Sequence, residues 1–448
     1  MTLEPVHMEE IAGIASGIEY ADAAEESDDM IHVFEMLSEL RDGEHLILKA
    51  AGKLFRSFVD ARRMSLSADE FKTTYSSDSG STNPILFERG LFLDICHAAM
   101  AATPTDLNLH RKRTIVCTGF NPAGKAKLPG TEDWKLFDDG YGRSKMIQID
   151  PSLLKIRAGR MVHDYSIYSS ESEHILWTQA DMDTNGFFIM DGPLYPRQLM
   201  YWMGTDSEKV LIRYDKNAKQ ILQNYIDIMD FHLKNKMPVV GFVKNPAETQ
   251  IMNLLRKRVK EEKKFMELPW ATDTQMFKAL LKPAKADTGK ADTGKAGAAG
   301  ASAVGAAGAG TENAGARFKI TYTNWFLQLK QYYDDDIKTG SPLMEESLTH
   351  SFEPEDYTVA FFAVRVPYED SSVVFKIESL YGLIKDEDMR RRITQKILYE
   401  LSAGKIPETL LKADSIAKIG GDEKKEIQNL FTVDKSYNNF RWGDFDEL

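Results

Sequence analysis

Cysteine is scarce in this chain, and the residue pairs that usually mark a zinc site are missing. Two cysteines, Cys96 and Cys117, occur among 448 residues, too few for a disulfide framework or a four-cysteine zinc site. No His-x-x-x-His or Cys-x-x-Cys pair is present, so the sequence offers no zinc motif. These absences predict a reducing, cytoplasmic setting and a site built from other side chains.

Long apolar runs and a basic excess are missing as well. No run approaches the roughly 20 residues that a membrane helix needs, and Glu4, Glu9 and Glu10 replace the basic start of a signal peptide. The formal net charge of −12 argues against a passive nucleic-acid coat, which is normally basic. The charge does not exclude a nuclease, because local basic residues and metal ions can hold phosphates on an acidic protein.

Strand-like and helical segments alternate along the chain, which predicts an α/β architecture. A P-loop is missing, so the chain is not expected to hydrolyse nucleotides by itself. Helices are expected at residues 30–40, 47–58, 91–102, 170–180, 218–234, 386–402 and 408–419. Strands are expected at residues 71–75, 115–117, 146–149, 186–190, 237–243, 318–322, 357–366 and 373–378.

Residues 282–316 differ in kind from the rest. Lys-Ala-Asp-Thr-Gly occurs twice in tandem, from Lys285 and from Lys290, and a Gly/Ala/Ser tract follows. Such a segment has too little apolar surface to offset the entropy of ordering. Because strand-like sequence resumes after it, we interpret it as a flexible insertion within a domain.

Two aspartates follow strand-like segments. Asp191 comes directly after the apolar residues 186–190 and before a Gly-Pro turn. Ligand sites of open α/β sheets lie at the carboxyl ends of the strands, although an Asp-Gly pair is also common in a plain turn. Asp78 begins an Asp-Ser-Gly-Ser segment after residues 71–75, and this second acidic position favours the site interpretation.

Two further carboxylates are candidates on helices. Asp414 is expected to share an apolar stripe with Leu410 and Ala417. A carboxylate that faces the core needs a cation or a donor; the alternative is that Asp414 faces solvent. Glu173, with Glu171 as its competitor, lies on the helix before the Asp191 strand, where most glutamates are simply solvated.

Carboxylate oxygens suit hard divalent cations, Mg²⁺ or Mn²⁺. The candidate metal ligands and catalytic residues are Asp78, Glu173, Asp191 and Asp414. Lys244, which ends the predicted strand at 237–243, and Arg213 are candidates to bind the phosphates of DNA.

The four stretches that carry most information are Asp78-Ser-Gly-Ser, Ile189-Met-Asp191-Gly-Pro-Leu-Tyr195, Val239-Val-Gly-Phe-Val-Lys244 and Ile406-Pro-Glu-Thr-Leu-Leu-Lys-Ala-Asp414. Their order and spacing resemble the NurA nucleases of archaea and bacteria. The resemblance implies a ribonuclease H-like mixed sheet flanked by helices, in a nuclease domain at residues 65–430. The apolar spacing before it predicts a helical N-terminal region at 1–64, and a C-terminal tail is expected at 431–448.

The same resemblance implies an activity and partners. It implies a Mn²⁺- or Mg²⁺-dependent deoxyribonuclease acting from 5′ ends, a homodimer, and the hexameric ATPase HerA as partner in end resection during double-strand break repair. It matches Asp78 with the first family aspartate, Asp191 with the second, and Glu173 with the intervening glutamate.

Two departures from the family pattern leave alternatives open. Ser79 is inserted into a motif that many members write Asp-Gly-Ser, and Asp414 stands where the family usually has histidine. An aspartate could bind metal but is a poorer acid at neutral pH. The alternatives are a catalytically weakened adaptor subunit of an ATPase complex and a metal-dependent phosphotransferase on the same fold.

Overall fold

The computed structural model describes most of the chain. The described residues are 4–17, 28–87, 90–122, 124, 128–129, 133–153, 158–204, 214–244, 246–262, 266, 268–283, 318–329, 348–368, 371–404 and 406–431. The predicted insertion at 282–316 and the predicted tail at 431–448 lie outside them, apart from residues 282, 283 and 431.

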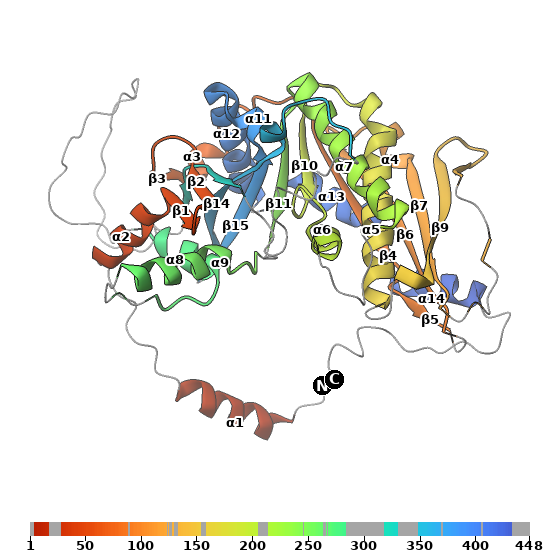
Figure 1. Cartoon of the computed structure of the whole chain (residues 1–448), viewed down its shortest axis with the longest axis horizontal. Helices are drawn as coiled ribbons and strands as arrows, with labels where there is room; N and C mark the ends of the chain where they lie inside the picture. Colours follow the sequence, from red (N-terminus) through yellow and green to blue (C-terminus); the bar gives the residue numbers. More distant parts are fainter. Residues whose placement is uncertain are drawn as a thin grey trace.

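Among the described residues, 15 strands form one mixed sheet (Figure 1). Its main path is β1-β2-β13-β14-β15-β11-β10-β4-β6-β7-β9-β8, while β3 and β12 pair with each other, β12 also pairs with β14, and β5 pairs with β6. The strands are β1 (Glu39–Asp42), β2 (His45–Ala50), β3 (Arg56–Asp60), β4 (Thr74–Ser81), β5 (Ile85–Leu86), β6 (Phe92–Thr103), β7 (Arg113–Phe120), β8 (Lys135–Leu136), β9 (Gly142–Ile149), β10 (Phe187–Asp191), β11 (Val239–Val243), β12 (Lys319–Thr323), β13 (Phe326–Gln328), β14 (Val359–Tyr368) and β15 (Ser371–Leu380).

Helices cover both faces of this sheet. In Figure 1, α5 crosses the front of the central strands with α7 packed beside it, and α13 lies behind them. The helices are α1 (Pro5–Ser16), α2 (Asp28–Met36), α3 (Ala61–Met64), α4 (Leu107–Arg111), α5 (Ala158–Thr178), α6 (Arg197–Gly204), α7 (Lys216–Asn235), α8 (Gln250–Glu261), α9 (Asp273–Leu280), α11 (Tyr381–Ile384), α12 (Glu387–Gly404), α13 (Glu408–Ala417) and α14 (Gly421–Leu430), with short 3₁₀ turns at Pro151–Leu153, Gln179–Asp181 and Pro354–Tyr357.

The central strands lie in the order β7-β6-β4-β10-β11. β6 is antiparallel to both β4 and β7, whereas β10 is parallel to β4 and to β11. β10 is buried on both faces, which explains its unbroken apolar sequence. The predicted α/β fold, a ribonuclease H-like mixed sheet flanked by helices, is confirmed.

Two predicted helices are wrong. Residues 91–102 form strand β6, and residues 47–58 lie mainly in β2 and β3. The alanines of β6 from Ala98 to Ala102 are buried between helices on both faces, so the alternation that marks a strand is lost. In the N-terminal region, a turn at Gly52 with φ of +89° separates β2 from β3. This region therefore contains strands as well as helices.

Candidate functional site

Asp78 and Asp191 lie on neighbouring parallel strands. β4 and β10 pair in register up to Ser77 and Met190, so the two aspartates occupy the next step on each strand. Neighbouring strands are about 4.8 Å apart, which places the two backbones side by side. Asp191 ends β10, as expected, whereas Asp78 lies within β4, which continues to Ser81 instead of turning.

Glu171 reaches the same place from α5. Its Oε1 accepts a hydrogen bond of 2.5 Å from the hydroxyl of Ser79. Burial raises the pKa of Glu171 to about 8, the Ser79 hydrogen bond opposes that shift, and the charges of Asp78 and Asp191 add to it. Burial and the charge of Asp191 raise the pKa of Asp78 to about 6, against the backbone hydrogen bond from Ser79. Three carboxylates therefore repel one another at this point.

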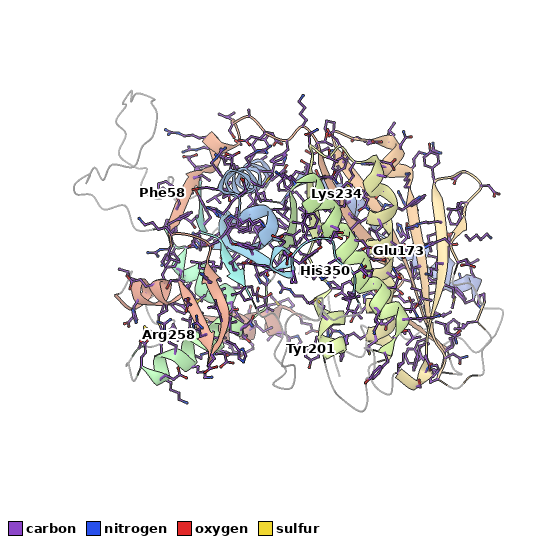
Figure 2. All side chains as sticks on the ribbon, turned by 45° about the horizontal axis from the view of Figure 1, so that its top comes forward. Phe58, Glu173, Tyr201, Lys234, Arg258 and His350 are labelled. Atoms are coloured by element: carbon purple, nitrogen blue, oxygen red, sulfur yellow. The ribbon has the colours of Figure 1, made fainter. Side chains whose placement is uncertain are left out.

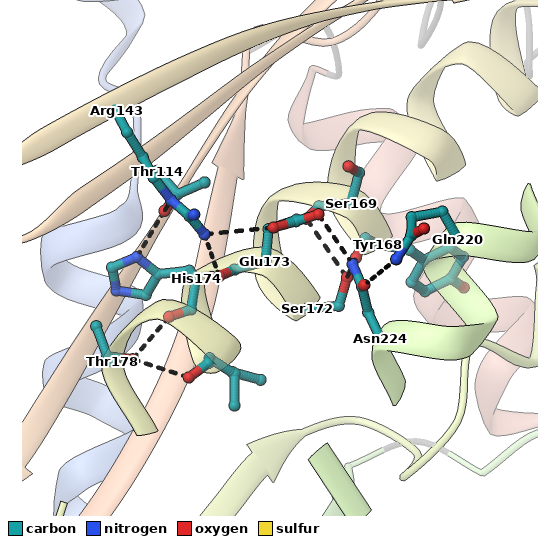
Figure 3. Close-up of polar contacts among 11 residues, drawn as sticks. Thr114, Arg143, Tyr168, Ser169, Ser172, Glu173, His174, Thr178, Gln220 and Asn224 are labelled. Atoms are coloured by element: carbon teal, nitrogen blue, oxygen red, sulfur yellow. Dashed lines mark hydrogen bonds and ion pairs between the residues drawn. The ribbon is translucent and has the colours of Figure 1, made fainter. Parts of the chain in front are cut away.

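Glu173 lies elsewhere on α5. Its Oε1 accepts a hydrogen bond of 3.2 Å from Asn224 on α7, and its Oε2 lies 3.4 Å from Nη2 of Arg143 (Figures 2 and 3). Residues two apart on a helix point to different faces. The structure thus brings Glu171, the weaker sequence candidate, to the two aspartates and does not bring Glu173 there.

A helical stripe in the sequence distinguishes the two glutamates. Tyr168, Glu171 and Ile175 fall at positions i, i+3 and i+7 of α5, which share one face. Ile175 is buried, and all three residues line a small cavity of about 30 Å³ beside Asp191. A cavity of that size has room for a water molecule or an ion of similar size. This stripe was the signal that could have selected Glu171.

Lys244 supplies a positive charge at the edge of the site. It follows β11, and its Nζ lies 2.6 Å from Oδ2 of Asp191. The ammonium group offsets part of the negative charge of the site. Arg213, the other predicted phosphate-binding residue, lies outside the described part of the chain.

Asp414 lies at the rim of the site rather than in the core. On α13 the buried positions are Thr409, Leu410, Ala413 and Ala417, while Asp414 is exposed. The prediction that Asp414 faces the core is therefore wrong, because the residue before it, Ala413, takes the buried position. Its charge still acts on Asp78, because it contributes to the raised pKa of that carboxyl group.

Gly80 explains how α13 approaches the site so closely. A Cβ added to Gly80 would lie 1.8 Å from the carbonyl oxygen of Ala417. The end of α13 therefore rests directly on the β4 backbone, two residues after Asp78. Only glycine leaves room for this contact, which carries Asp414 to the rim.

The turn after Asp191 is held by contacts that sequence reasoning missed. Gly192 has φ of +93°, in the left-handed region that favours glycine. A Cβ on Gly241 would lie 2.7 Å from the amide nitrogen of Leu194, so the turn crosses β11 where no side chain stands. The Leu194 amide donates a 3.2 Å hydrogen bond to buried Glu378. These contacts fix the Asp191 carboxylate at the strand end.

The donor set fits a hard divalent cation by its chemistry. Asp78, Glu171 and Asp191 offer only oxygen atoms, and their mutual repulsion is what a cation would relieve. Within the described residues, no group of three His, Cys, Asp or Glu side chains is placed so that it could hold a metal ion. The Nζ of Lys244 and the hydroxyl of Ser79 contact two of these carboxylates instead.

The fold and site together define an α/β protein with a carboxylate centre on a ribonuclease H-like sheet. The model of the NurA domain family matches residues 162–419, more than half of the chain. The chain therefore belongs to the NurA family. Among the described residues, no helix is long and apolar enough to cross a membrane.

Solved NurA structures are similar to this chain at low identity. The NurA nuclease from Sulfolobus solfataricus is 9% identical, with a TM-score of 0.42 over 97% of this chain and 96% of that chain. A crystal structure of NurA with manganese is 10% identical, with a TM-score of 0.41 over 97% and 99% of the two chains. A comparison with curated proteins finds no match. These values are too low to transfer site residues between chains.

Proposed function

We propose that this NurA-family protein is a metal-dependent deoxyribonuclease that hydrolyses phosphodiester bonds. The observation that carries the proposal is the convergence of Asp78, Glu171 and Asp191 from two neighbouring strands and one covering helix. Carboxylates gathered in this way repel one another when they are ionised, and a bound cation would relieve that repulsion.

Each side chain has a distinct role in this proposal. Asp78, Glu171 and Asp191 would hold Mn²⁺ or Mg²⁺, and the exposed Asp414 would add negative charge at the rim. A bound divalent ion activates water and neutralises charge on the scissile phosphate. Lys244, whose Nζ lies beside Asp191, would contact a phosphate oxygen of the substrate. Ser79 orients Glu171 through its hydrogen bond.

The biological setting belongs to the same proposal. We infer a cytoplasmic homodimer that resects DNA from 5′ ends in double-strand break repair, together with a HerA-type hexameric ATPase. The support is membership of the NurA family, and a NurA crystallised with manganese makes Mn²⁺ the first metal to test.

The exposed helix α1 is the candidate surface for these partners. None of its residues is buried, and Val6, Met8, Ile11 and Ile14 all expose apolar side chains. Deleting residues 1–25 should weaken self-association or ATPase binding in analytical ultracentrifugation. Unchanged association of both kinds would contradict this assignment.

The direct test of activity uses Asp191→Ala. Purified wild-type protein with Mn²⁺ should cleave labelled single-stranded or duplex DNA, and the variant should lose this activity by on the order of 100-fold or more. Equal cleavage by both proteins would remove Asp191 from the site. A panel of DNA, RNA and small phosphoesters separates a deoxyribonuclease from a phosphotransferase with another substrate.

A second candidate function is a nuclease-like adaptor that has lost most of its activity. The exposed Asp414, in the place of the family histidine, and the Lys244–Asp191 ion pair favour it. An adaptor would bind DNA ends and the ATPase without cleaving DNA. Metal-dependent cleavage by the wild-type protein would exclude this function.

A further inference from the structure

A second polar cluster lies beyond Asp78, where β4 ends. Asp94, on β6, is fully buried. Its Oδ1 accepts hydrogen bonds from the hydroxyls of Ser81 at 2.7 Å and Thr82 at 3.1 Å. Its Oδ2 lies 2.7 Å from Nδ1 of His163 on α5. Both carboxylate oxygens are thus satisfied, and Asp94 fixes the imidazole with a proton on Nδ1.

The outer edge of the His163 ring is available to a ligand. Among the described residues, the polar contacts of this ring run through Nδ1, to Asp94 and, at 3.3 Å, to the Ser81 hydroxyl. The side chain is 30% exposed, although its carboxylate partner is completely buried. Because Nδ1 faces Asp94, Nε2 lies on the opposite side of the ring and can donate a hydrogen bond outward when the ring is charged.

Basic and acidic groups both lie at this edge: His163 and Lys424 are the basic ones, and Asp94 and Asp164 are the acidic ones. Burial acts to lower the pKa of His163, but the hydrogen bond and charge of Asp94 raise it overall, and the charge of Lys424 opposes that rise. Lys424 belongs to α14, the helix that lies beside this end of α5 in Figure 1, and its charge acts on the ring. Asp164 adds a negative charge nearby, but its carboxylate accepts a hydrogen bond from the indole of Trp202 on α6.

The position of this cluster suits a DNA strand that enters the carboxylate site. His163 precedes Glu171 by eight residues on α5, or about 12 Å at 1.5 Å per residue. One DNA strand advances about 3.4 Å per nucleotide along a duplex. The cluster therefore lies a few nucleotides from the proposed point of cleavage. In Figure 1, α14 lies close to the end of α5 that carries this cluster.

We propose that His163 and Lys424 form a phosphate subsite that binds the DNA backbone a few nucleotides from the scissile bond. Two cations that repel each other are each stabilised when a phosphate lies between them. Asp94 acts through His163 and is a positioning residue. This inference rests on the proposed nuclease function and adds to it a specific contact with the DNA strand.

The test measures DNA binding separately from cleavage. His163→Asn keeps a donor for Asp94 but removes Nε2 and the charge, and Lys424→Gln removes the second cation. Lys425→Gln is the matched control, because Lys425 is the next residue on α14 and is exposed with its Nζ 3.7 Å from Asp422. Fluorescence anisotropy with a labelled oligodeoxythymidylate in EDTA gives the dissociation constant at several salt concentrations.

We expect His163→Asn and Lys424→Gln each to weaken binding several-fold. Each should also reduce the slope of log affinity against log salt by about 0.7, the value for one phosphate contact with a single strand. Lys425→Gln should match the wild type. Wild-type slopes in both test variants would overturn the subsite, and thermal melting shows whether either variant is folded.

A second measurement locates the contact. Oligonucleotides carrying one neutral methylphosphonate linkage should bind the wild type more weakly when that linkage lies a few nucleotides from the cleavage point, and this penalty should disappear in His163→Asn. A penalty that persists in the variant contradicts the proposal. If the wild type neither binds nor cleaves DNA, the proposed nuclease function itself fails; if it does both and the variants match it, only this subsite fails.

Discussion

At the scale of single residues, two glycines determine where the carboxylates lie. Gly241 lets the Asp191 turn cross β11, and Gly80 lets the end of α13 rest on β4. Neither glycine has a positive φ, so the requirement is for space and not for backbone freedom. The positions of the carboxylates at the proposed site therefore depend on two residues that have no side chain.

Gly241→Ala should displace the Asp191 turn. The added Cβ would lie 2.7 Å from the Leu194 amide nitrogen and 2.8 Å from the Gly192 carbonyl oxygen. Overpacking of this kind costs about 1–3 kcal/mol in stability, and cleavage should fall on the order of 10- to 100-fold. Gly404→Ala, where the added Cβ meets nothing within 4 Å, is the control for chemical denaturation and cleavage assays. Wild-type cleavage by Gly241→Ala would show that the turn does not position Asp191.

The His163–Asp94 pair should make stability depend on pH. The net pKa of His163 is raised above its ordinary value of 6.5, so the folded state holds the proton more tightly than the unfolded state. This contribution is complete below pH 6.5 and is lost as the pH rises through the folded-state pKa. His163→Asn should remove this part of the pH dependence of the melting temperature. An identical pH profile in wild type and variant would contradict the charged pair.

The sequence predicts the site residues unevenly. Asp191 is recognisable because it ends an apolar strand, and strand ends collect ligands. Asp78 is recognisable only as a second acidic position after the strand-like residues 71–75, and β4 in fact continues past it to Ser81. In the sequence, only the helical stripe that includes Ile175 distinguishes Glu171 from Glu173 as the site residue. Gly241 gives no signal, because its role depends on a turn that crosses it from another strand.

At the scale of elements, a buried ion network joins the site to the neighbouring strands. Glu378, on β15, receives hydrogen bonds from the Leu194 amide and from Arg197 at the start of α6. Its Oε1 also lies 3.1 Å from Nζ of Lys376, which in turn lies 2.7 Å from Oε2 of Glu248. Burial lowers the pKa of Lys376 to about 8. The network therefore holds β15, α6 and the Asp191 turn in one arrangement.

Glu378→Gln should loosen that arrangement. Arg197 and Lys376 would both lose a carboxylate partner in a buried setting, which typically costs about 3 kcal/mol. Urea denaturation measures this loss. Asp388→Asn, in an exposed pair with Arg391, is the control and should leave the denaturation midpoint unchanged. Equal midpoints for Glu378→Gln and the wild type would mean that the network adds no stability.

Elements buried on both faces are the hardest to assign from sequence. The helices at 218–234 and 386–402 are confirmed as α7 and α12 because each has a polar face that reveals its period. β6 has an alanine-rich run buried on both sides, and alanine favours helices in isolation. Packing between α5 and α13 overrides that preference, and no pattern in the local sequence indicates this packing.

At the scale of the whole molecule, the two ends of the predicted insertion lie close together beside the sheet. The carbonyl oxygen of Leu281, just after α9, accepts a 2.6 Å hydrogen bond from the hydroxyl of Thr321 in β12. The chain thus returns to the same place after residues 284–317, which lie outside the described part. The low-complexity composition predicts that this segment adds nothing to the core.

Replacing residues 284–316 with a short Gly-Ser linker should leave the fold intact. A longer loop costs little additional entropy on closure, so the melting temperature should change by only a degree or two at most. Differential scanning fluorimetry measures this, and DNA cleavage should match the full chain. Loss of the cooperative transition would show that the segment belongs to the core.

The account depends most on the convergence of Asp78, Glu171 and Asp191, and the two glutamates of α5 test it within one helix. The measurement is the rate of Mn²⁺-dependent cleavage of a labelled oligonucleotide by wild type, Glu171→Gln and Glu173→Gln, each shown by melting to be folded. The account predicts that Glu171→Gln loses on the order of 100-fold or more, while Glu173→Gln keeps most of the wild-type rate. The opposite order, or equal rates in all three proteins, would contradict it.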